Sequence, residues 1–274
     1  MRPVAIGGVA VGDGQPLALL AGPCAIEGEA PALRAAEALV GIAAAAGIPF
    51  VYKSSYDKAN RSAGRSYRGP GLAEGLRILR KVRATFGCPV LSDVHLPSEV
   101  PAAAEVLDCL QVPAFLCRQT DLVVACGRSG RPVNVKKGQF LAPWDMGNVV
   151  DKLRDAGCSD VLLTERGATF GYNNLVVDFR GLRVMRDLGV PVVFDATHSV
   201  QLPGAAGTRS GGERRYVAPL ARAAVAFGVD AVFMEVHEAP DRAPSDGATM
   251  LPLAELPALL RELQAIRSSL APVP

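Results

Sequence analysis

Eight short apolar runs recur along this chain, and longer stretches with helical spacing separate them. The runs span 17–24, 49–55, 88–95, 109–116, 132–137, 160–167, 191–198 and 231–237. Each run is too short for an ordinary helix, and several are rich in valine, so all eight are expected to be strands. Eight strands that alternate with eight helices over about 250 residues predict an α/β fold, a closed parallel (β/α)8 barrel of the TIM type.

The clearest helical stretches end at glycine. Residues 29–47 are rich in alanine and end at Gly47, and residues 71–87 end at Gly87. Glycine adopts the left-handed backbone that ends many helices, so both positions are expected helix ends. A third stretch, residues 251–266, is expected to close the chain as its last helix.

A doubly wound open sheet is the alternative fold for this alternation. That fold usually places a glycine-rich phosphate turn after its first strand, and the sequence GPCAIEGEA at 22–30 does not match G-x-G-x-x-G. No linker or low-complexity segment interrupts the chain, so residues 1–274 are expected to form a single domain. Residues 1–16 are expected to form a β-hairpin that turns at Gly12–Gly14 and covers the bottom of the barrel.

Composition narrows the class of protein. The chain has 274 residues, is 49% hydrophobic and 20% charged, and carries a formal charge of +2. It can bury a large core, and this small charge argues against a nucleic-acid or polybasic membrane partner. The N-terminus has no signal-peptide pattern, and no apolar run approaches the roughly 20 residues of a membrane span. A cytoplasmic protein is expected.

Six cysteines are present, and no pair has the C-x-x-C spacing of a zinc knuckle or a thioredoxin motif. In a cytoplasmic chain they are expected to be reduced, and most are expected to pack as small apolar residues. Cys24 differs from the others because it ends the first apolar run.

Nearly all of the eight runs end in polar residues. These residues are Cys24, Lys53, Ser55, Asp93, His95, Lys136, Arg166, His198, Glu235 and His237. The carboxyl ends of all strands in such a barrel converge on one mouth, so these side chains are expected to meet there. Surface loops of random polarity would explain any one of them, but they explain the whole set poorly.

The cations form the first group at the predicted mouth. They are Lys53, Lys58, Arg61, Lys136 and Arg166, and Arg118 follows the fourth run. Cations this close together would repel one another without anions. The group therefore predicts a site for more than one phosphate or carboxylate.

A second group combines a thiol, an imidazole and two carboxylates. Cys24, His198, Glu235 and Asp246 suit a divalent transition metal, although the residues alone also allow a simple hydrogen-bonded histidine. The glycine-rich segment 203–215 after the seventh run is compatible with a lid over the mouth or with a passive loop.

Several segments resemble the 3-deoxy-D-manno-octulosonate-8-phosphate synthase family. They are KSSYDKANRS (53–62), LSDVHLPSEV (91–100), LTERGATFGYNNLVVD (163–178) and FDATHSVQ (194–201), and the resemblance covers nearly the whole chain. The segment KANRS is the specific part, since related synthases that use erythrose 4-phosphate carry K-P-R-T there. The resemblance implies condensation of phosphoenolpyruvate with D-arabinose 5-phosphate, a transferase reaction of lipopolysaccharide synthesis.

The resemblance also implies roles for single residues. Positions that hold phosphoenolpyruvate are matched by Lys53, Ser55, Lys58, Gln111, Lys136, Arg166 and His198. Positions that hold the sugar phosphate are matched by Asn60, Arg61 and Ser62. Arg118 matches an arginine that reaches a neighbouring subunit's site, which implies a homo-oligomer and, for this family, a tetramer. The catalytic candidates are Lys53, Lys58, Asp93 and His198, with Asp93 as a proton relay.

The residue at position 24 divides the family. Metal-dependent members have cysteine there and metal-independent members have asparagine, so Cys24 implies a divalent metal (zinc, iron, manganese or cobalt) bound by Cys24, His198, Glu235 and Asp246. Two alternatives stay open beside this assignment. One is a related phosphoenolpyruvate-dependent synthase of the sialic-acid type or of the type that uses erythrose 4-phosphate, and the other is a non-catalytic sugar-phosphate binding barrel.

Overall fold

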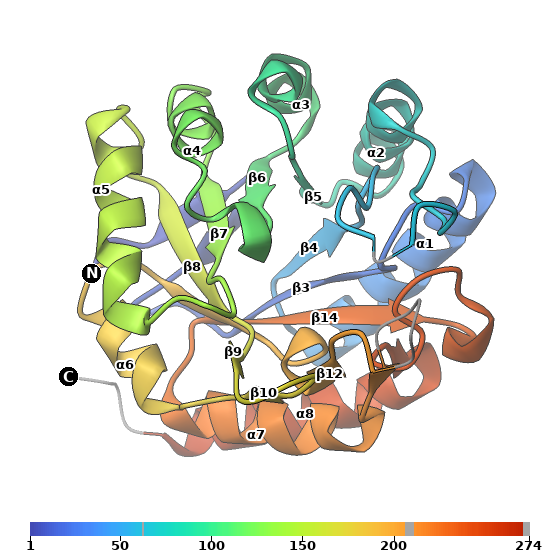
Figure 1. Ribbon diagram of the computed structural model, residues 1–274. Helices are drawn as coiled ribbons and strands as arrows, with labels where there is room; N and C mark the ends of the chain where they lie inside the picture. The colour runs from blue at the N-terminus through green and yellow to red at the C-terminus, as the bar shows by residue number, and fades with distance from the viewer. Residues whose placement is uncertain (62, 206–210, 271–274) are drawn as a thin grey trace.

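The computed structural model describes residues 1–61, 63–205 and 211–270, and Figure 1 shows their arrangement as a barrel of strands inside a ring of helices. The barrel strands are β3 (Ala18–Gly22), β4 (Phe50–Lys53), β5 (Val90–Asp93), β6 (Cys109–Val112), β7 (Val133–Lys136), β8 (Val161–Glu165), β11 (Val192–Asp195) and β14 (Ala231–His237). All neighbouring pairs are parallel, and β14 pairs with both β3 and β11, which closes the sheet. The predicted (β/α)8 barrel is confirmed.

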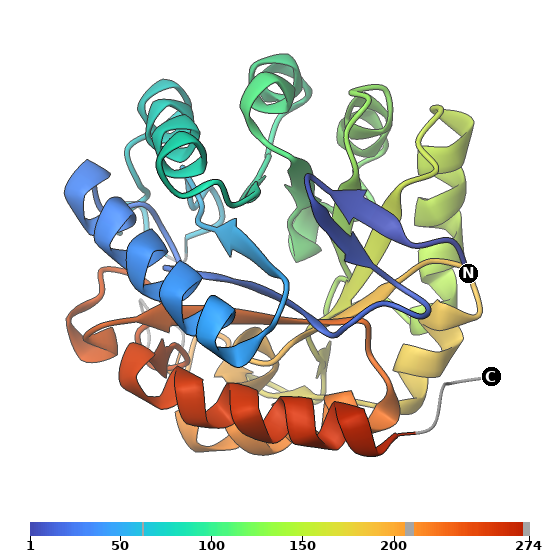
Figure 2. The same ribbon diagram turned by 180° about the vertical axis from the view of Figure 1, so that it is seen from behind.

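Eight α-helices of the described residues cover the outside of this barrel, as Figures 1 and 2 show. They are α1 (Glu29–Ala46), α2 (Leu72–Phe86), α3 (Val100–Val106), α4 (Thr120–Gly127), α5 (Met146–Asp155), α6 (Arg180–Arg186), α7 (Val217–Phe227) and α8 (Leu256–Ser269). The predicted ends at Gly47 and Gly87 are confirmed, with left-handed φ angles of 63° and 65°. No helix in this part of the chain is both long and apolar enough to cross a bilayer.

The last helix begins later than the sequence suggested. Residues 251–252 form a short strand, β15 (Leu251–Pro252), which pairs with the end of β14. A single turn of 3₁₀-helix follows, and α8 starts at Leu256. The apolar pattern does not distinguish a short strand from the first turn of a helix, because Leu251 in β15 and Leu256 at the start of α8 are both buried.

Among the described residues, three short strand pairs lie outside the barrel sheet. β1 (Val4–Ile6) pairs with β2 (Val9–Val11), β9 (Ala168–Thr169) with β10 (Leu175–Val176), and β12 (Gln201–Leu202) with β13 (Gly211–Gly212). The glycine-rich segment 203–215 includes β13, and its residues 206–210 lie outside the described part of the chain. A lid role for this segment stays a prediction.

The N-terminal hairpin is present, but the predicted turn is wrong. The chain turns at Gly7–Gly8, where Gly7 has a φ of 57°, and Ile6 lies opposite Val9. This register buries the apolar side chains of both strands, whereas the segment Gly12–Gly14 only leads the chain on to β3. The hairpin lies against one end of the barrel in Figure 2.

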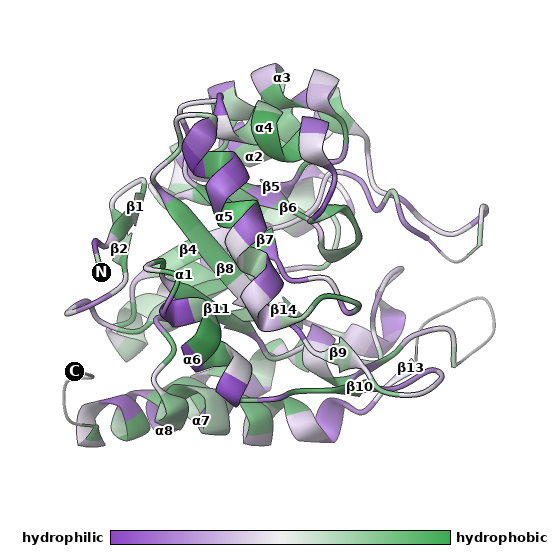
Figure 3. Cartoon of the chain, turned by 60° about the vertical axis from the view of Figure 1, so that its left-hand side comes forward, coloured by the Kyte–Doolittle hydropathy of each residue, from purple (hydrophilic) through white to green (hydrophobic). Residues whose placement is uncertain are grey.

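Two apolar cores follow from the alternation of each strand. Outward side chains pack beneath the helices in one large cluster. Inward side chains near the strand starts, such as Leu20, Val51 and Phe233, form a second cluster with the hairpin residues Val4 and Ile6. Figure 3 shows the barrel strands as mainly hydrophobic and the helices as mixed. The amino end of the barrel is therefore filled and closed, which leaves the carboxyl end for polar chemistry.

Gly22, the last residue of β3, gives a prediction about the stability of the barrel. A Cβ atom at Gly22 would lie 2.0 Å from the carbonyl oxygen of Lys53, so Gly22→Ala forces two backbones apart. We expect a loss of about 3 kcal/mol in the free energy of unfolding, measured by denaturant titration. The control is Gly41→Ala in the exposed part of α1, where a Cβ meets nothing within 4 Å. This change should stabilise by about 0.5–1 kcal/mol, and equal stability of the two variants would contradict the prediction.

Candidate active site

A cavity of about 510 Å³ lies at the carboxyl ends of the barrel strands. The predicted site residues that line it are Lys53, Lys58, Asn60, Arg61, Asp93, Lys136, Arg166, His198 and Asp246. Side chains from positions far apart in the sequence thus meet at one mouth, as the strand ends predicted. Ser62 lies outside the described residues.

The other predicted residues do not line the cavity. Ser55 and Gln111 are fully buried within the barrel next to Asp93, while Cys24 and Glu235 are buried beside Asp246 and His198. Arg118 is exposed, just before α4, and does not line the cavity. His237 ends β14 but turns outward, where its Nε2 lies 3.1 Å from Glu27.

A chain of hydrogen bonds crosses the barrel below the mouth. Thr164 donates to Asn134 at 2.7 Å, Asn134 donates to Gln111 at 2.9 Å, and Gln111 donates to Asp93 at 2.5 Å. Ser55 donates to the other carboxylate oxygen of Asp93, also at 2.5 Å. These inward residues come from neighbouring strands, so the parallel register itself aligns them. The chain fixes the orientation of the Asp93 carboxylate.

Two lysines lie between buried carboxylates at this depth. The Nζ atoms of Lys53 and Lys58 lie 3.2 and 3.3 Å from Glu235 Oε1, and 3.6 and 3.9 Å from Asp93 Oδ2. Burial alone would raise the pKa of both carboxyl groups, but the lysines hold each pKa well below its usual range. Carboxylates of the protein therefore balance the charges of Lys53 and Lys58, a compensation that the sequence argument from cation repulsion did not include.

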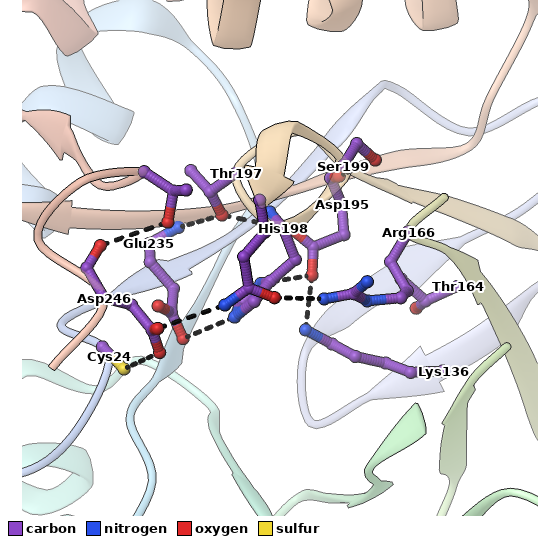
Figure 4. A network of polar contacts seen from close by, with 12 residues as sticks. Cys24, Lys136, Thr164, Arg166, Asp195, Thr197, His198, Ser199, Glu235 and Asp246 are labelled. Carbon is purple, nitrogen blue, oxygen red and sulfur yellow. Dashed lines mark hydrogen bonds and ion pairs between the residues drawn. The ribbon is translucent and has the colours of Figure 1, made fainter. Parts of the chain in front are cut away.

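Asp195 lies at the end of β11 and joins two predicted residues, as Figure 4 shows. Its Oδ2 accepts a hydrogen bond from His198 Nδ1 at 2.7 Å and pairs with Lys136. The other ring nitrogen of His198, Nε2, is directed to Glu235, 3.6 Å away. Asp195 therefore fixes the ring orientation and leaves Nε2 facing the buried carboxylate.

Cys24, Glu235 and Asp246 form a possible metal-binding group, because their ligand atoms all lie within 4.8 Å of one another. Burial, and then the charge of Glu235, raises the pKa of the Cys24 thiol, which donates to Asp246 at 3.1 Å. Glu235 Oε2 is buried without a hydrogen-bond partner among the described residues. A divalent cation would compensate these groups and favour the thiolate, so the donor set fits a transition metal. His198 lies beside this set.

Two guanidinium groups flank the metal-binding group. Arg166 donates to Gln201 at 2.9 Å and Gln201 donates to Asp246 at 3.2 Å, while Arg61 donates to Ser245 at 2.7 Å. Arg166 also keeps a buried nitrogen, NH1, without a partner in the described part of the chain, and Arg61 keeps Nε. Buried donors of this kind suit anionic ligands next to the metal-binding group.

Comparison with known proteins places this geometry in a family. Residues 2–271 match the DAHP synthetase I family. The chain belongs to this family. It is 60% identical to the 2-dehydro-3-deoxyphosphooctonate aldolase of Citrifermentans bemidjiense and 61% identical to that of Trichlorobacter lovleyi, each over 97% of both chains. The protein of the same name from a Synechococcus species is 59% identical over 95% of this chain and 92% of its own.

Sequence reasoning missed four polar residues of this family member's site: Asp195, Gln201, Ser245 and Asn134. Asp195 carried a signal, since it ends a strand three residues before His198 in FDATH. Ser245 also carried a signal, since it directly precedes Asp246, a predicted ligand. Asp246 has a left-handed φ of 49°, a conformation that aspartate adopts more readily than most residues. Gln201 and Asn134 carried none, because their roles depend on partners distant in sequence.

Proposed function

We propose that this chain condenses phosphoenolpyruvate with D-arabinose 5-phosphate and water. The products are 3-deoxy-D-manno-octulosonate 8-phosphate, a precursor for lipopolysaccharide, and inorganic phosphate. The relatives named 2-dehydro-3-deoxyphosphooctonate aldolase support this reaction. The observation that carries it is that Arg166 and Arg61 are each connected by hydrogen bonds to Asp246 of the metal-binding group, through Gln201 and Ser245, since two phosphorylated substrates can then meet beside it.

We assign the two anions to opposite sides of the cavity. Lys136 and Arg166 hold phosphoenolpyruvate, with Lys53 and Lys58 near its reacting end and His198 beside it. Asn60, Arg61 and Ser62 hold the sugar phosphate. Bringing both reactants into one oriented pair replaces much of the entropic barrier of a two-substrate reaction.

The reaction then forms one carbon–carbon bond and one carbon–oxygen bond, to water, and breaks the carbon–oxygen bond to phosphate. C3 of phosphoenolpyruvate attacks the sugar aldehyde, whose oxygen becomes a hydroxyl group and takes up a proton. Water adds to C2 and supplies that proton, and phosphate leaves with the bridging oxygen and the second proton of the water as the 2-keto group forms. We assign Asp93 as the proton relay, because its carboxylate is fixed in orientation and lies 3.9 Å from the Lys58 ammonium.

The metal belongs to the same proposal. Cys24, Glu235 and Asp246, with His198 beside them, would hold zinc, iron, manganese or cobalt. Once bound, the ion would orient and polarise the aldehyde. The residues of the chain do the rest: they bind both anions, and Asp93 relays the proton.

The assembly and location are proposed from the same resemblance. Arg118 is exposed and does not line the cavity of its own chain, which supports a contact with the sugar-phosphate site of a second copy, and the resemblance makes that assembly a homotetramer. We place the enzyme in the cytoplasm, where phosphorylated sugars and phosphoenolpyruvate are available.

The choice of aldehyde tests the proposal. Phosphate release with arabinose 5-phosphate should exceed that with erythrose 4-phosphate by at least about tenfold in kcat/KM, or about 1.4 kcal/mol of transition-state binding. N-acetylmannosamine, which has no phosphate for Arg61, should give no turnover. Equal turnover with both phosphorylated sugars would refute the substrate, and turnover with N-acetylmannosamine alone would indicate a synthase of the sialic-acid type.

A further inference from the structure

Lys137 and Glu165 lie opposite each other on the outer side of the barrel wall. The register of β7 and β8 pairs Lys136 with Thr164, and the next backbone N–H, that of Lys137, donates to Thr164 at 2.8 Å. Side chains alternate along each strand, so Lys136 and Arg166 face the cavity while Lys137 and Glu165 face the helices. Each outer residue is thus the chain neighbour of a cavity-facing cation.

Both outer side chains are buried and form a cross-link between the two loops that leave β7 and β8. Lys137 Nζ lies 3.5 Å from Glu165 Oε1 and donates to the carbonyl oxygens of Gly138 and Leu141, each at 3.3 Å. Glu165 Oε1 also accepts the backbone N–H groups of Arg166 at 3.0 Å and of Gly167 at 2.7 Å. One carboxylate oxygen therefore shapes the backbone that carries Arg166.

We propose that Lys137 and Glu165 are positioning residues that hold Lys136 and Arg166 at the spacing required by one phosphorylated substrate. The inference rests on the proposed function for the identity of that substrate, phosphoenolpyruvate. The pair itself touches no ligand, since neither residue lines the cavity.

The cavity-facing cations need such support because they are alike in charge and buried. Burial lowers the pKa of both Lys136 and Arg166, and each is only partly compensated by Asp195. Without a fixed backbone the two side chains could move apart before the ligand arrives. Folding alone does not require the outer pair, because apolar residues often replace a buried ion pair without loss of stability.

The test is Glu165→Gln, which keeps the acceptor oxygen but removes the charge opposite Lys137. We expect the KM for phosphoenolpyruvate to rise at least about fivefold and the KM for arabinose 5-phosphate to change less than about twofold. An unchanged KM for phosphoenolpyruvate, or an equal rise in both values, overturns the proposal.

Two further variants separate positioning from stability. Asp230→Asn breaks a comparable buried pair with Arg186 at the closed end of the barrel, 2.8 Å long, and should lower the melting temperature without changing either KM. Glu165→Gln leaves the buried Lys137 charge without its partner and should lower the melting temperature. The double variant Lys137→Met with Glu165→Gln removes both buried charges, so its melting temperature should return toward that of the parent protein while the KM for phosphoenolpyruvate stays high. If the melting temperature and the KM for phosphoenolpyruvate both returned to the parent values, the pair would serve stability alone and the proposal would be overturned. A parent protein that releases no phosphate would refute the proposed function instead.

Discussion

Removal of bound metal by a strong chelator is expected to abolish phosphate release, and zinc, iron, manganese or cobalt should restore it to differing degrees. The reason lies in Cys24, Glu235 and Asp246, whose ligand atoms all lie within 4.8 Å of one another and form a donor set that fits a divalent transition metal. The barrel should stay folded, because its two apolar cores do not include the site. Activity, metal content and circular dichroism are measured on the same sample. Full activity after verified removal would refute the metal role.

Variants of Cys24 extend this test to the ligand itself. Cys24→Ser should bind metal more weakly, since an alcohol does not ionise near neutral pH as a metal-bound thiol does, and a competing chelator measures the change. Cys24→Asn should keep measurable activity without metal. The matched control is Cys158→Ser, because the Cys158 thiol donates to backbone oxygens of Arg131 and Asp160 just before β8 begins, at the opposite end of that strand from the mouth. Loss of metal affinity in the control as well would assign the effect to folding.

Arg61→Ala is expected to raise the KM for arabinose 5-phosphate about 100-fold, or about 2.7 kcal/mol, with a much smaller change for phosphoenolpyruvate. Arg61 lies at one side of the cavity, held by Ser245, and its guanidinium suits a bidentate contact with phosphate. Arg61→Lys should recover only part of the loss, because an ammonium cannot copy that geometry.

The matched variant for this prediction is Arg166→Ala, because Arg166 is connected to Asp246 through Gln201. It should show the reverse pattern, with the large rise in KM confined to phosphoenolpyruvate. Steady-state kinetics with each substrate varied in turn measures both. If Arg61→Ala affected only phosphoenolpyruvate, the two sides of the cavity would be assigned the wrong way round.

The barrel could be predicted because its signals are local. Eight apolar runs of strand length and helix ends at Gly47 and Gly87 each report on a few neighbouring residues. The hairpin turn was misplaced because Gly7–Gly8 and Gly12–Gly14 are both good turns. Only the pairing of Ile6 with Val9, which buries the apolar faces against the barrel interior, decides between them.

The sequence could predict which residues belong to the site, but not which of their atoms contact one another. Convergence of strand ends brings Lys53, Arg166 and His198 to one cavity whatever their separation in sequence. The compensation of the cations by Asp195 and Glu235 depends on which atoms approach within hydrogen-bond distance, and no spacing rule contains that information. The same holds for Gln111, which is buried against Asp93 within the barrel.

The most direct test of the account follows phosphorus through the reaction. Metal-restored protein is incubated with phosphoenolpyruvate and arabinose 5-phosphate, and ³¹P NMR records each phosphorus species while mass spectrometry identifies the isolated product. We expect inorganic phosphate to appear in equal amount to the phosphoenolpyruvate consumed, together with an eight-carbon phosphorylated 2-keto acid. An unchanged phosphoenolpyruvate signal, or phosphate released without the eight-carbon product, would contradict it.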